Sequence, residues 1–281
     1  MVGQVVKAHS SNFIVANGSE LYDLSARGLI KRNKTGILCG DFVDFSDGVI
    51  NKVLDRKNSF IRPSVANIDT VVIVIAPAPK PDFYLIDKLV INAIKEDCEI
   101  VFAVNKTDLD DSLFNKIKDE YKFCSTKFVK VCTKDSTGID ELRNLLKGKL
   151  CVLAGQSAVG KTSLINSLFF LNLKTGELSE KISRGKHTTT HSEMHVFGDI
   201  KIIDSPGFAV IDADVDLAVL PECYPEYFAL QSGCKFRGCA HISEPECKIK
   251  EAVKEGKLSQ DRYNRYVEIY KDLLQRREIY G

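Results

Sequence analysis

The spacing of hydrophobic positions divides the chain into regions of different character. Up to about residue 63, short apolar stretches such as residues 12–16 and 41–45 are separated by the pairs Asn17-Gly18 and Asp47-Gly48, which favour hairpin turns. Several short strands in such a length predict a small β-barrel. Beyond this point, longer apolar runs that read as buried strands alternate with helical stretches, which predicts a central α/β domain.

A phosphate-binding motif follows one of these buried strands. Residues 155–162 read GQSAVGKT and fit the pattern GxxxxGK[ST], between the apolar run 150–154 and a predicted helix at 163–170. The glycines allow backbone N–H groups to turn toward phosphate oxygens at the positive end of that helix. We expect Lys161 to neutralise the β- and γ-phosphates and Thr162 to coordinate Mg²⁺. The predicted nucleotide-binding residues of this segment are Gly155, Gln156, Ser157, Ala158, Val159, Gly160, Lys161, Thr162 and Ser163.

A second motif identifies the base. The apolar run 99–104 leads into the tetrapeptide NKTD at 105–108, a weak match alone because such a segment is often a surface turn. In this motif the Asp108 carboxylate accepts hydrogen bonds from the N1–H and 2-amino groups of guanine, and adenine lacks that pair of donors. Together with a phosphate loop, the motif predicts GTP. A loop after the run 128–131 is expected to pack on the guanine. The predicted base-binding residues are Asn105, Lys106, Thr107, Asp108, Cys132 and Thr133.

Two further segments complete a GTPase site. Asp204 and Gly207 form a DxxG motif after the apolar run 200–203, and we expect the Gly207 N–H to contact the γ-phosphate. Between the phosphate loop and this motif lie three adjacent threonines at 188–190, of which we select Thr189 as a metal ligand, although the sequence does not separate them. The predicted magnesium ligands are Thr162, Thr189 and Asp204, the last of them through water.

The catalytic group is less well marked. The residue after the DxxG motif is Phe208, whose side chain cannot orient the attacking water as the glutamine of Ras-like switches does. Intrinsic hydrolysis should therefore be slow. His187 is our candidate for orienting or deprotonating the water near neutral pH. A loop histidine that is merely exposed, or that contacts RNA, is an equal alternative.

The order of the motifs is rotated relative to an ordinary guanine-nucleotide domain, in which the phosphate loop comes first. Here NKTD precedes Cys132-Thr133-Lys134, and the phosphate loop, the threonine run and DSPG follow. With this order the chain resembles the circularly permuted GTPases and, among them, the ribosome small subunit-dependent GTPase A family, over essentially all 281 residues. The resemblance implies a GTPase that binds the small (30S) ribosomal subunit and 16S rRNA, is stimulated by that subunit, and couples hydrolysis to late subunit maturation and its own release. It also implies that the N-terminal barrel is an OB-fold, whereas the pattern alone leaves an SH3-like barrel open.

A cysteine and histidine cluster near the C-terminus predicts a metal site. Its members are Cys234, Cys239, His241 and Cys247. We recognise no signal peptide and no apolar run long enough to span a bilayer, so we expect a cytoplasmic protein, in which clustered thiols are metal ligands rather than disulfides. Three sulfurs and one imidazole suit a closed tetrahedral Zn²⁺ site with a structural role, and the spacing matches the zinc segment of the family. The other six cysteines are expected to be buried as small hydrophobic residues.

A long amphipathic helix is predicted from residue 259 to residue 280. Its apolar stripe consists of Tyr263, Tyr266, Val267, Tyr270, Leu273 and Leu274. Arginines such as Arg262, Arg265, Arg276 and Arg277 lie on the rest of its surface, where some of them can face phosphates. In the barrel region, the basic cluster at 31–34 is expected on a loop, either as a nucleic-acid contact or simply as a solvated segment.

Composition and charge set the remaining bounds. With 44% hydrophobic and 27% charged residues, the chain can build two or three domains with real cores. We expect an OB-fold RNA-binding barrel at 1–63, a circularly permuted α/β P-loop GTPase domain at 64–211, and a mainly α zinc-binding domain with the C-terminal helix at 212–281. The net charge of +1 gives no global basic field, so any RNA contact must be local.

We expect a monomer with GTP and Mg²⁺ as its substrate complex, one structural Zn²⁺, and no membrane partner. Two alternatives stay open for its function. One is a GTP-dependent switch for a different RNA or RNA-modification client. The other is a non-catalytic RNA-binding module that retains GTP for stability, against which the intact Lys161, Thr162 and Asp204 argue.

Overall fold

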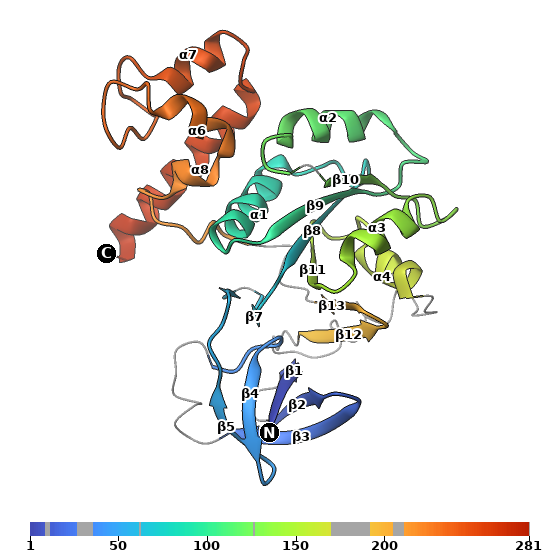
Figure 1. Ribbon diagram of the computed structural model, residues 1–281. Helices are drawn as coiled ribbons and strands as arrows, with labels where there is room; N and C mark the ends of the chain where they lie inside the picture. Colours follow the sequence, from blue (N-terminus) through green and yellow to red (C-terminus); the bar gives the residue numbers. More distant parts are fainter. Residues whose placement is uncertain are drawn as a thin grey trace.

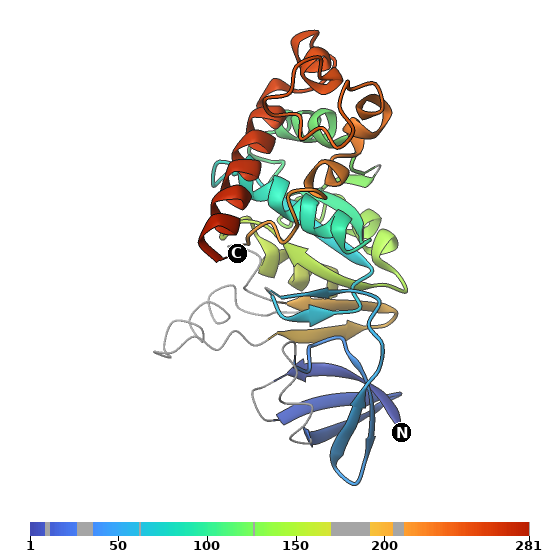
Figure 2. The same cartoon turned by 90° about the vertical axis from the view of Figure 1, so that its left-hand side faces the viewer.

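The computed structural model describes residues 1–8, 12–26, 36–61, 63–125, 127–169, 192–204 and 211–280. Figures 1 and 2 show three parts stacked along one direction: a small barrel, a sheet flanked by helices, and a helical C-terminal part. The fold class predicted from the sequence is confirmed. No helix within the described ranges is both long enough and apolar enough to span a bilayer.

The N-terminal part is a closed five-stranded barrel. Strand β1 pairs with β2, β2 with β3, β3 with β5 in parallel, and β5 with β4, which pairs again with β1 to close the barrel. This is an OB-like arrangement, as predicted. The strands are β1 (Val2–Ala8), β2 (Asn12–Asn17), β3 (Glu20–Ala26), β4 (Phe42–Ser46) and β5 (Val49–Val53). At the β4–β5 turn, Asp47 and Gly48 both have positive φ, 53° and 75°, which explains why Asp-Gly stands there.

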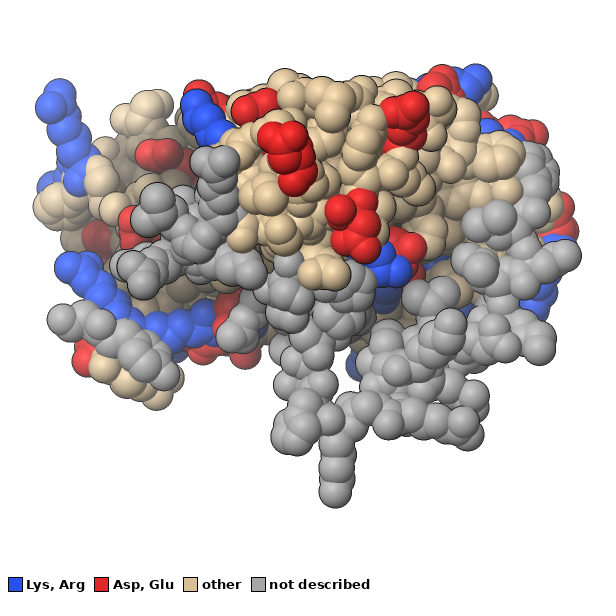
Figure 3. Space-filling model, turned by 90° about the horizontal axis from the view of Figure 1, so that it is seen from below, with Lys and Arg blue, Asp and Glu red and all other residues tan. Residues whose placement is uncertain are grey.

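Alternate residues of the barrel strands, including Val5, Val15, Val43 and Ile50, fill the interior and are fully buried. Over the described residues, the barrel exterior is not basic. Figure 3, which views the molecule from the barrel end, shows several Asp and Glu side chains on the described face and few Lys or Arg near its centre. The basic cluster at 31–34 lies outside the described residues.

The central part is an α/β sheet with the strand order β10–β9–β8–β11–β13–β12, in which only β12 runs antiparallel. The strands are β8 (Thr70–Ile75), β9 (Glu99–Val104), β10 (Lys127–Lys130), β11 (Leu150–Ala154), β12 (Glu193–Phe197) and β13 (Ile200–Asp204). Helices α1 (Phe83–Lys95) and α2 (Ser112–Tyr121) pack on one face, and α3 (Ile139–Leu146) and α4 (Lys161–Phe169) pack on the other. Because carboxyl ends of parallel strands meet at one edge, the segments after β9, β10 and β11 meet there, and Asp204 at the end of β13 lies at the same edge.

The barrel continues this sheet at its β12 edge. Lys7 of β1 pairs with Glu193 of β12, and their side chains form an ion pair of 2.9 Å. Lys201 of β13 donates to the Gln4 side chain at 2.9 Å. The chain then crosses from the barrel to β8 through the short strands β6 (Ser59–Phe60) and β7 (Val65–Ala66).

The C-terminal part packs on α1. It consists of the 3₁₀ helix η3 (Leu220–Cys223), α6 (Pro225–Gln231), α7 (Lys248–Lys254) and α8 (Gln260–Tyr280). The predicted C-terminal helix is therefore confirmed. On its apolar stripe, Tyr266 and Leu273 are buried, and Leu274 is exposed at the rim. The core of this part also includes Ile91 of α1, so the two parts share a hydrophobic contact.

Two arginines of α8 differ from the expectation that they lie on a free polar face. Arg262 donates to Glu226 of α6 and to Asp87 of α1, and Arg265 donates to Asp87 and to Glu120 of α2. The side chain of Asp87 is fully buried, and that of Arg262 is 4% exposed. Both guanidinium groups are buried and paired with carboxylates, which compensate their charges. They are therefore not available to phosphates.

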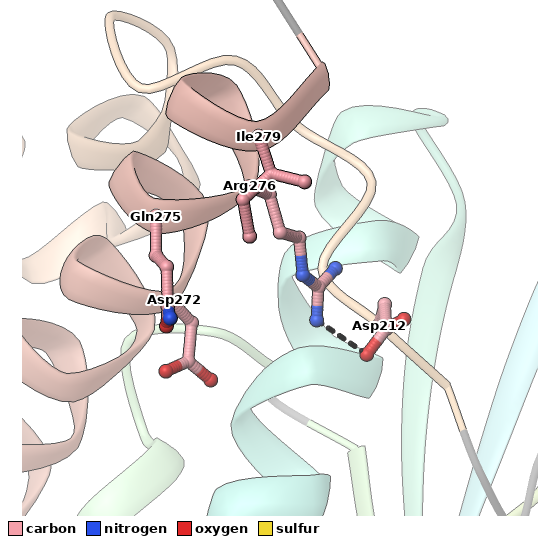
Figure 4. A pocket seen from close by; sticks show the side chains of 5 residues that line it. All are labelled: Asp212, Asp272, Gln275, Arg276 and Ile279. Carbon is pink, nitrogen blue, oxygen red and sulfur yellow. Dashed lines mark hydrogen bonds and ion pairs between the residues drawn. The ribbon is translucent and has the colours of Figure 1, made fainter.

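The segment that leads into the C-terminal part lies along α1. The Asn92 side chain donates to the Asp212 carbonyl at 2.9 Å and accepts from the Asp214 N–H at 2.8 Å. At the other side of the segment, Arg276 of α8 forms an ion pair of 2.6 Å with the Asp212 carboxylate (Figure 4). Residues 212–214 are therefore held by α1 on one side and by α8 on the other.

Candidate nucleotide and metal sites

The phosphate loop lies between β11 and α4, as its sequence predicts. Gly155 has φ 139°, and a Cβ there would lie 2.3 Å from the Val74 carbonyl oxygen. Gly160 has φ 97°, and a Cβ there would lie 2.4 Å from the Asn105 side-chain nitrogen. Both positions therefore require glycine, the first for its contact with β8 and the second for its contact with the NKTD segment.

The structure brings the NKTD segment and the phosphate loop together. The buried Asn105 amide donates to the Val159 carbonyl at 2.9 Å, across 54 residues of sequence. The Lys106 ammonium donates to the carbonyl oxygens of Ala158 at 2.8 Å and Ala78 at 2.7 Å. The two motifs are thus joined by direct hydrogen bonds, although their order in the chain is reversed relative to ordinary guanine-nucleotide domains.

Asp108, the residue predicted to read guanine, lies against the Cys132 loop. The Asp108 carboxylate pairs with Lys134 at 2.5 Å, and the Cys132 thiol lies 3.7 Å from its other oxygen. The hydrogen bond from Lys134 lowers the pKa of the Asp108 carboxyl, so the group is an ionised acceptor at neutral pH. Thr107 donates to the Val131 carbonyl at 3.3 Å, which fixes the NKTD segment against the Cys132 loop.

Lys134 is a contact that the candidate set did not contain. In the sequence, only its position directly after Cys132 and Thr133 could have indicated this contact, because its partner Asp108 lies 26 residues away. The ammonium shares the carboxylate that guanine would use, and the Lys134 side chain is 72% exposed. It can therefore move without disturbing a packed core.

Lys161 and Asp204 form the charged floor of the phosphate site. The Lys161 ammonium donates to the carbonyl oxygens of Gly155 and Gln156, both at 2.7 Å. Burial lowers the pKa of Lys161 to about 8, and the nearby Asp204 carboxylate opposes that shift. Burial also raises the pKa of Asp204. A triphosphate with Mg²⁺ fits this pair, because it places negative charge beside the lysine and positive charge beside the aspartate.

Several predicted site residues lie outside the described part of the chain. They are the catalytic candidate His187, the magnesium candidate Thr189, and Gly207 of the DxxG motif. Of the predicted magnesium ligands, Thr162 lies in the first turn of α4 and Asp204 ends β13, and both are described.

The four predicted metal ligands form a single cluster. The ligand atoms of Cys234, Cys239, His241 and Cys247 all lie within 4.8 Å of one another. His241 Nδ1 is 3.7 Å from the Cys234 sulfur and 3.3 Å from the Cys247 sulfur. In tetrahedral zinc coordination, with bonds of about 2.3 Å to sulfur and about 2.0 Å to nitrogen, the corresponding separation is roughly 3.5 Å. The donor set and its spacing fit a metal ion.

Surrounding groups hold this cluster in shape. The Tyr263 hydroxyl donates to the His241 carbonyl at 2.7 Å, and the Tyr266 hydroxyl donates to the Ala240 carbonyl at 2.6 Å. The Glu244 carboxylate accepts from the N–H of Ala240 at 2.7 Å. The Tyr227 ring meets the His241 ring edge-on at 5.5 Å. Packing of the helix stripe, which the sequence predicted, thus also positions the ligand loop. Of the other six cysteines, five are buried and Cys124 is half-buried.

Comparison with known proteins agrees with this geometry. The family model of the RsgA N-terminal domain matches residues 2–52, and that of the RsgA GTPase matches residues 53–214. The curated protein "Small ribosomal subunit biogenesis GTPase RsgA" of Agathobacter rectalis is 36% identical, with 99% of this chain and 100% of that protein covered. "Small ribosomal subunit biogenesis GTPase RsgA 2" of Listeria innocua is 38% identical, with 99% of each covered.

Two solved structures share the whole architecture. YjeQ from Thermotoga maritima superposes with a TM-score of 0.81 at 34% identity, covering 97% of this chain and 98% of that one. YloQ, described as a circularly permuted GTPase, gives a TM-score of 0.77 at 27% identity and covers 98% and 95%. The rotated motif order, the GTPase class and the family resemblance read from the sequence are confirmed. The chain belongs to the RsgA family of GTPases.

Proposed function

We propose that this protein acts in biogenesis of the small ribosomal subunit, by binding the 30S subunit and coupling GTP hydrolysis to late maturation and its own release. The observation that carries the GTP-dependent part is the direct bonding of Asn105 and Lys106 to the phosphate loop. The ribosomal part rests on the relatives, which carry the name of small ribosomal subunit biogenesis GTPases.

In this proposal each site residue has a defined task. Asp108 accepts the two guanine donors, and the backbone of the phosphate loop surrounds the phosphates. Lys161 has three N–H donors, of which two hold carbonyl oxygens of its own loop, so within the described part of the chain one remains for a phosphate oxygen. Thr162, Thr189 and Asp204 would hold Mg²⁺, which would supply positive charge to neutralise the phosphates. Gly207 senses the γ-phosphate, and His187 orients the attacking water.

The Cys234, Cys239, His241 and Cys247 cluster would hold one structural Zn²⁺. All four coordination positions are supplied by protein, which leaves no open position for water activation. The role of the ion is therefore to fold the loops between α6 and α7. Zinc is the ion that best suits three thiolates and one imidazole in tetrahedral geometry.

Contact with 16S rRNA would be local. The described barrel exterior carries Glu20, Asp23 and Asp47 as exposed acids, and its lysines Lys7 and Lys52 are too few to balance them. We therefore place the barrel's RNA contact at the basic cluster 31–34 and not on the strands. This assignment also explains why the overall charge near zero does not conflict with RNA binding.

The decisive experiment is GTP turnover with and without purified 30S subunits. Strong stimulation by 30S subunits is the expected result, and Lys161→Ala should abolish it by removing tight nucleotide binding. Turnover that 30S subunits leave unchanged would indicate a different RNA client. No turnover under either condition would leave only a GTP-binding RNA-binding module.

A further inference from the structure

The side chain of Gln156 connects the phosphate loop to the helix on which the C-terminal part is docked. We propose that Gln156 is a positioning residue that couples nucleotide binding to the docking of the C-terminal metal-binding part on α1. This proposal rests on the proposed nucleotide site. The sequence motif requires no particular side chain at this position, so the coupling is a property of this chain's own contacts.

The side chain of Gln156 forms two hydrogen bonds with the turn that precedes α1. Its side-chain nitrogen donates to the Lys80 carbonyl at 3.2 Å, and its side-chain oxygen accepts from the Asp82 N–H at 2.9 Å. Asp82 is also the N-cap of α1, because its carboxylate accepts from the Leu85 N–H at 3.0 Å. The first turn of α1 is therefore attached to the phosphate loop through one amide side chain.

The backbone of Gln156 faces the phosphate site. Its carbonyl accepts from the Lys161 ammonium at 2.7 Å, and the remaining N–H of that ammonium is available to a phosphate. A bound phosphate consequently acts on the same cation that holds the Gln156 main chain. A second hold comes from Lys106, which bonds both to Ala158 in the phosphate loop and to Ala78 at the start of the same turn.

The far side of α1 is fixed to the C-terminal part. The buried Asp87 carboxylate accepts from Arg262, at 3.2 Å, and from Arg265. One helical turn earlier, the Tyr84 hydroxyl bonds to Asp272 of α8. A shift of α1 must therefore carry α8 with it or separate buried charges, and separating them is strongly unfavourable. In a rigid helix, displacement at the Asp82 end reaches Asp87 directly.

This coupling is distinguishable from simple bracing. If Gln156 only stabilises the phosphate loop, bound nucleotide does not change the hydrogen-exchange protection of α8, and replacing Gln156 destabilises the loop alone. If Gln156 couples the two sites, bound nucleotide changes the hydrogen-exchange protection of α8. By thermodynamic reciprocity, the packing of α8 on α1 then changes nucleotide affinity by the same factor. The response of α8 is therefore the readout that separates the two roles.

The test is hydrogen exchange of the full-length, metal-loaded protein with and without saturating GDP. Gln156→Met keeps the length and apolar stem of the side chain but removes both hydrogen bonds. In the unmodified protein we expect GDP to slow exchange in residues 260–273 by about fivefold or more. In Gln156→Met the phosphate loop should still be protected by GDP, and the α8 response should be reduced, because only Lys106 then joins the phosphate loop to the turn before α1. Gln275→Met makes the same chemical change at an exposed position of α8 and should retain the response.

An α8 response to GDP that persists at full size in Gln156→Met overturns the proposal, as does an unmodified protein whose α8 ignores bound GDP. Should Gln156→Met bind GDP too weakly to saturate, the reciprocal measurement decides. Arg265→Met should weaken GDP binding by about fivefold or more, and Arg277→Met, which changes an exposed arginine of the same helix, should not. Equal affinities in these two variants overturn the proposal. Failure of the unmodified protein to bind GDP at all would instead refute the nucleotide site.

Discussion

Replacing Asp108 by asparagine tests the assignment of the guanine-reading group. The substitution preserves the size of the side chain but exchanges one carboxylate oxygen for an N–H donor. Guanine presents two donors to this group, so one hydrogen bond is lost and its place is taken by two donors facing each other. The Lys134 ammonium, which pairs with Asp108 at 2.5 Å, loses its anionic partner as well.

The magnitude follows from the environment of the carboxylate. A hydrogen bond to a charged group contributes about 1.5–3 kcal/mol, and guanine makes two of them. Because the Asp108 side chain is 28% exposed and already shared with Lys134, the lower end of that range applies. Losing one of these two bonds and placing two donors opposite each other should together lower the affinity for GDP by roughly 10²-fold.

The assay is equilibrium binding of GDP and of xanthosine diphosphate to each variant. Xanthine carries a carbonyl where guanine has its 2-amino group, so an asparagine amide can donate to it. Asp108→Asn should therefore bind the xanthine nucleotide more tightly than it binds GDP, reversing the preference of the unmodified protein. Asp110→Asn makes the same change at an exposed carboxylate, whose bond goes to the Ser112 N–H at 2.8 Å, and should leave the preference intact. Undiminished GDP affinity in Asp108→Asn, or equal losses for both nucleotides, would refute the reasoning.

Three further outcomes are expected. Burial lowers the pKa of Lys161 to about 8, and phosphate binding requires its ammonium form. GDP affinity should therefore fall as pH rises through 8, by up to tenfold per unit because one proton is taken up, whereas Lys161→Arg should show no such fall; a flat profile from pH 7 to 9 in the unmodified protein contradicts this. Cys239→Ser should lower the zinc content measured by a colorimetric chelator and expose residues 234–247 to hydrogen exchange; full zinc content would argue against the ligand set. Asp87→Ala leaves Arg262 and Arg265 buried without their common partner and should destabilise the C-terminal part by about 3–5 kcal/mol in urea unfolding; a loss below about 1 kcal/mol would show that the network is dispensable.

Local patterns predicted the loops that the structure brings together as a candidate nucleotide site. Glycine at 155 and 160, the buried strands before each loop and the NKTD tetrapeptide are short-range signals, and they determine loop geometry regardless of the chain's order. The same holds for the ligand cluster at 234–247, where four ligands fall within one short stretch. The helix at 260–280 was predictable because its apolar repeat spans several turns.

Contacts between distant elements could not be predicted in this way. Arg262 and its partner Asp87 are separated by 175 residues, and an arginine between apolar positions reads as part of a polar face. The period of a helix shows which side is apolar, but it does not show which helix will lie against the other side. The side chain of Gln156 was hidden for a related reason, since a phosphate-loop motif describes a backbone and leaves its side chains unassigned.

The rotated order of the motifs explains why α1 is the element at which these contacts meet. Because the domain begins at β8, α1 is its first helix, and its N-terminus lies beside the phosphate loop that comes much later in the chain. The DxxG motif begins at Asp204, the last residue of β13, and Asp212 follows eight residues later in the chain. There the Asn92 side chain bonds to the Asp212 carbonyl, and Arg276 of α8 pairs with the Asp212 carboxylate. In an unpermuted domain the chain after this motif would continue into further strands and helices of the same sheet. Here residues 212–214 connect to a part whose helix α8 is fixed to α1, so α1 contacts the phosphate loop at its N-terminus and α8 along its length.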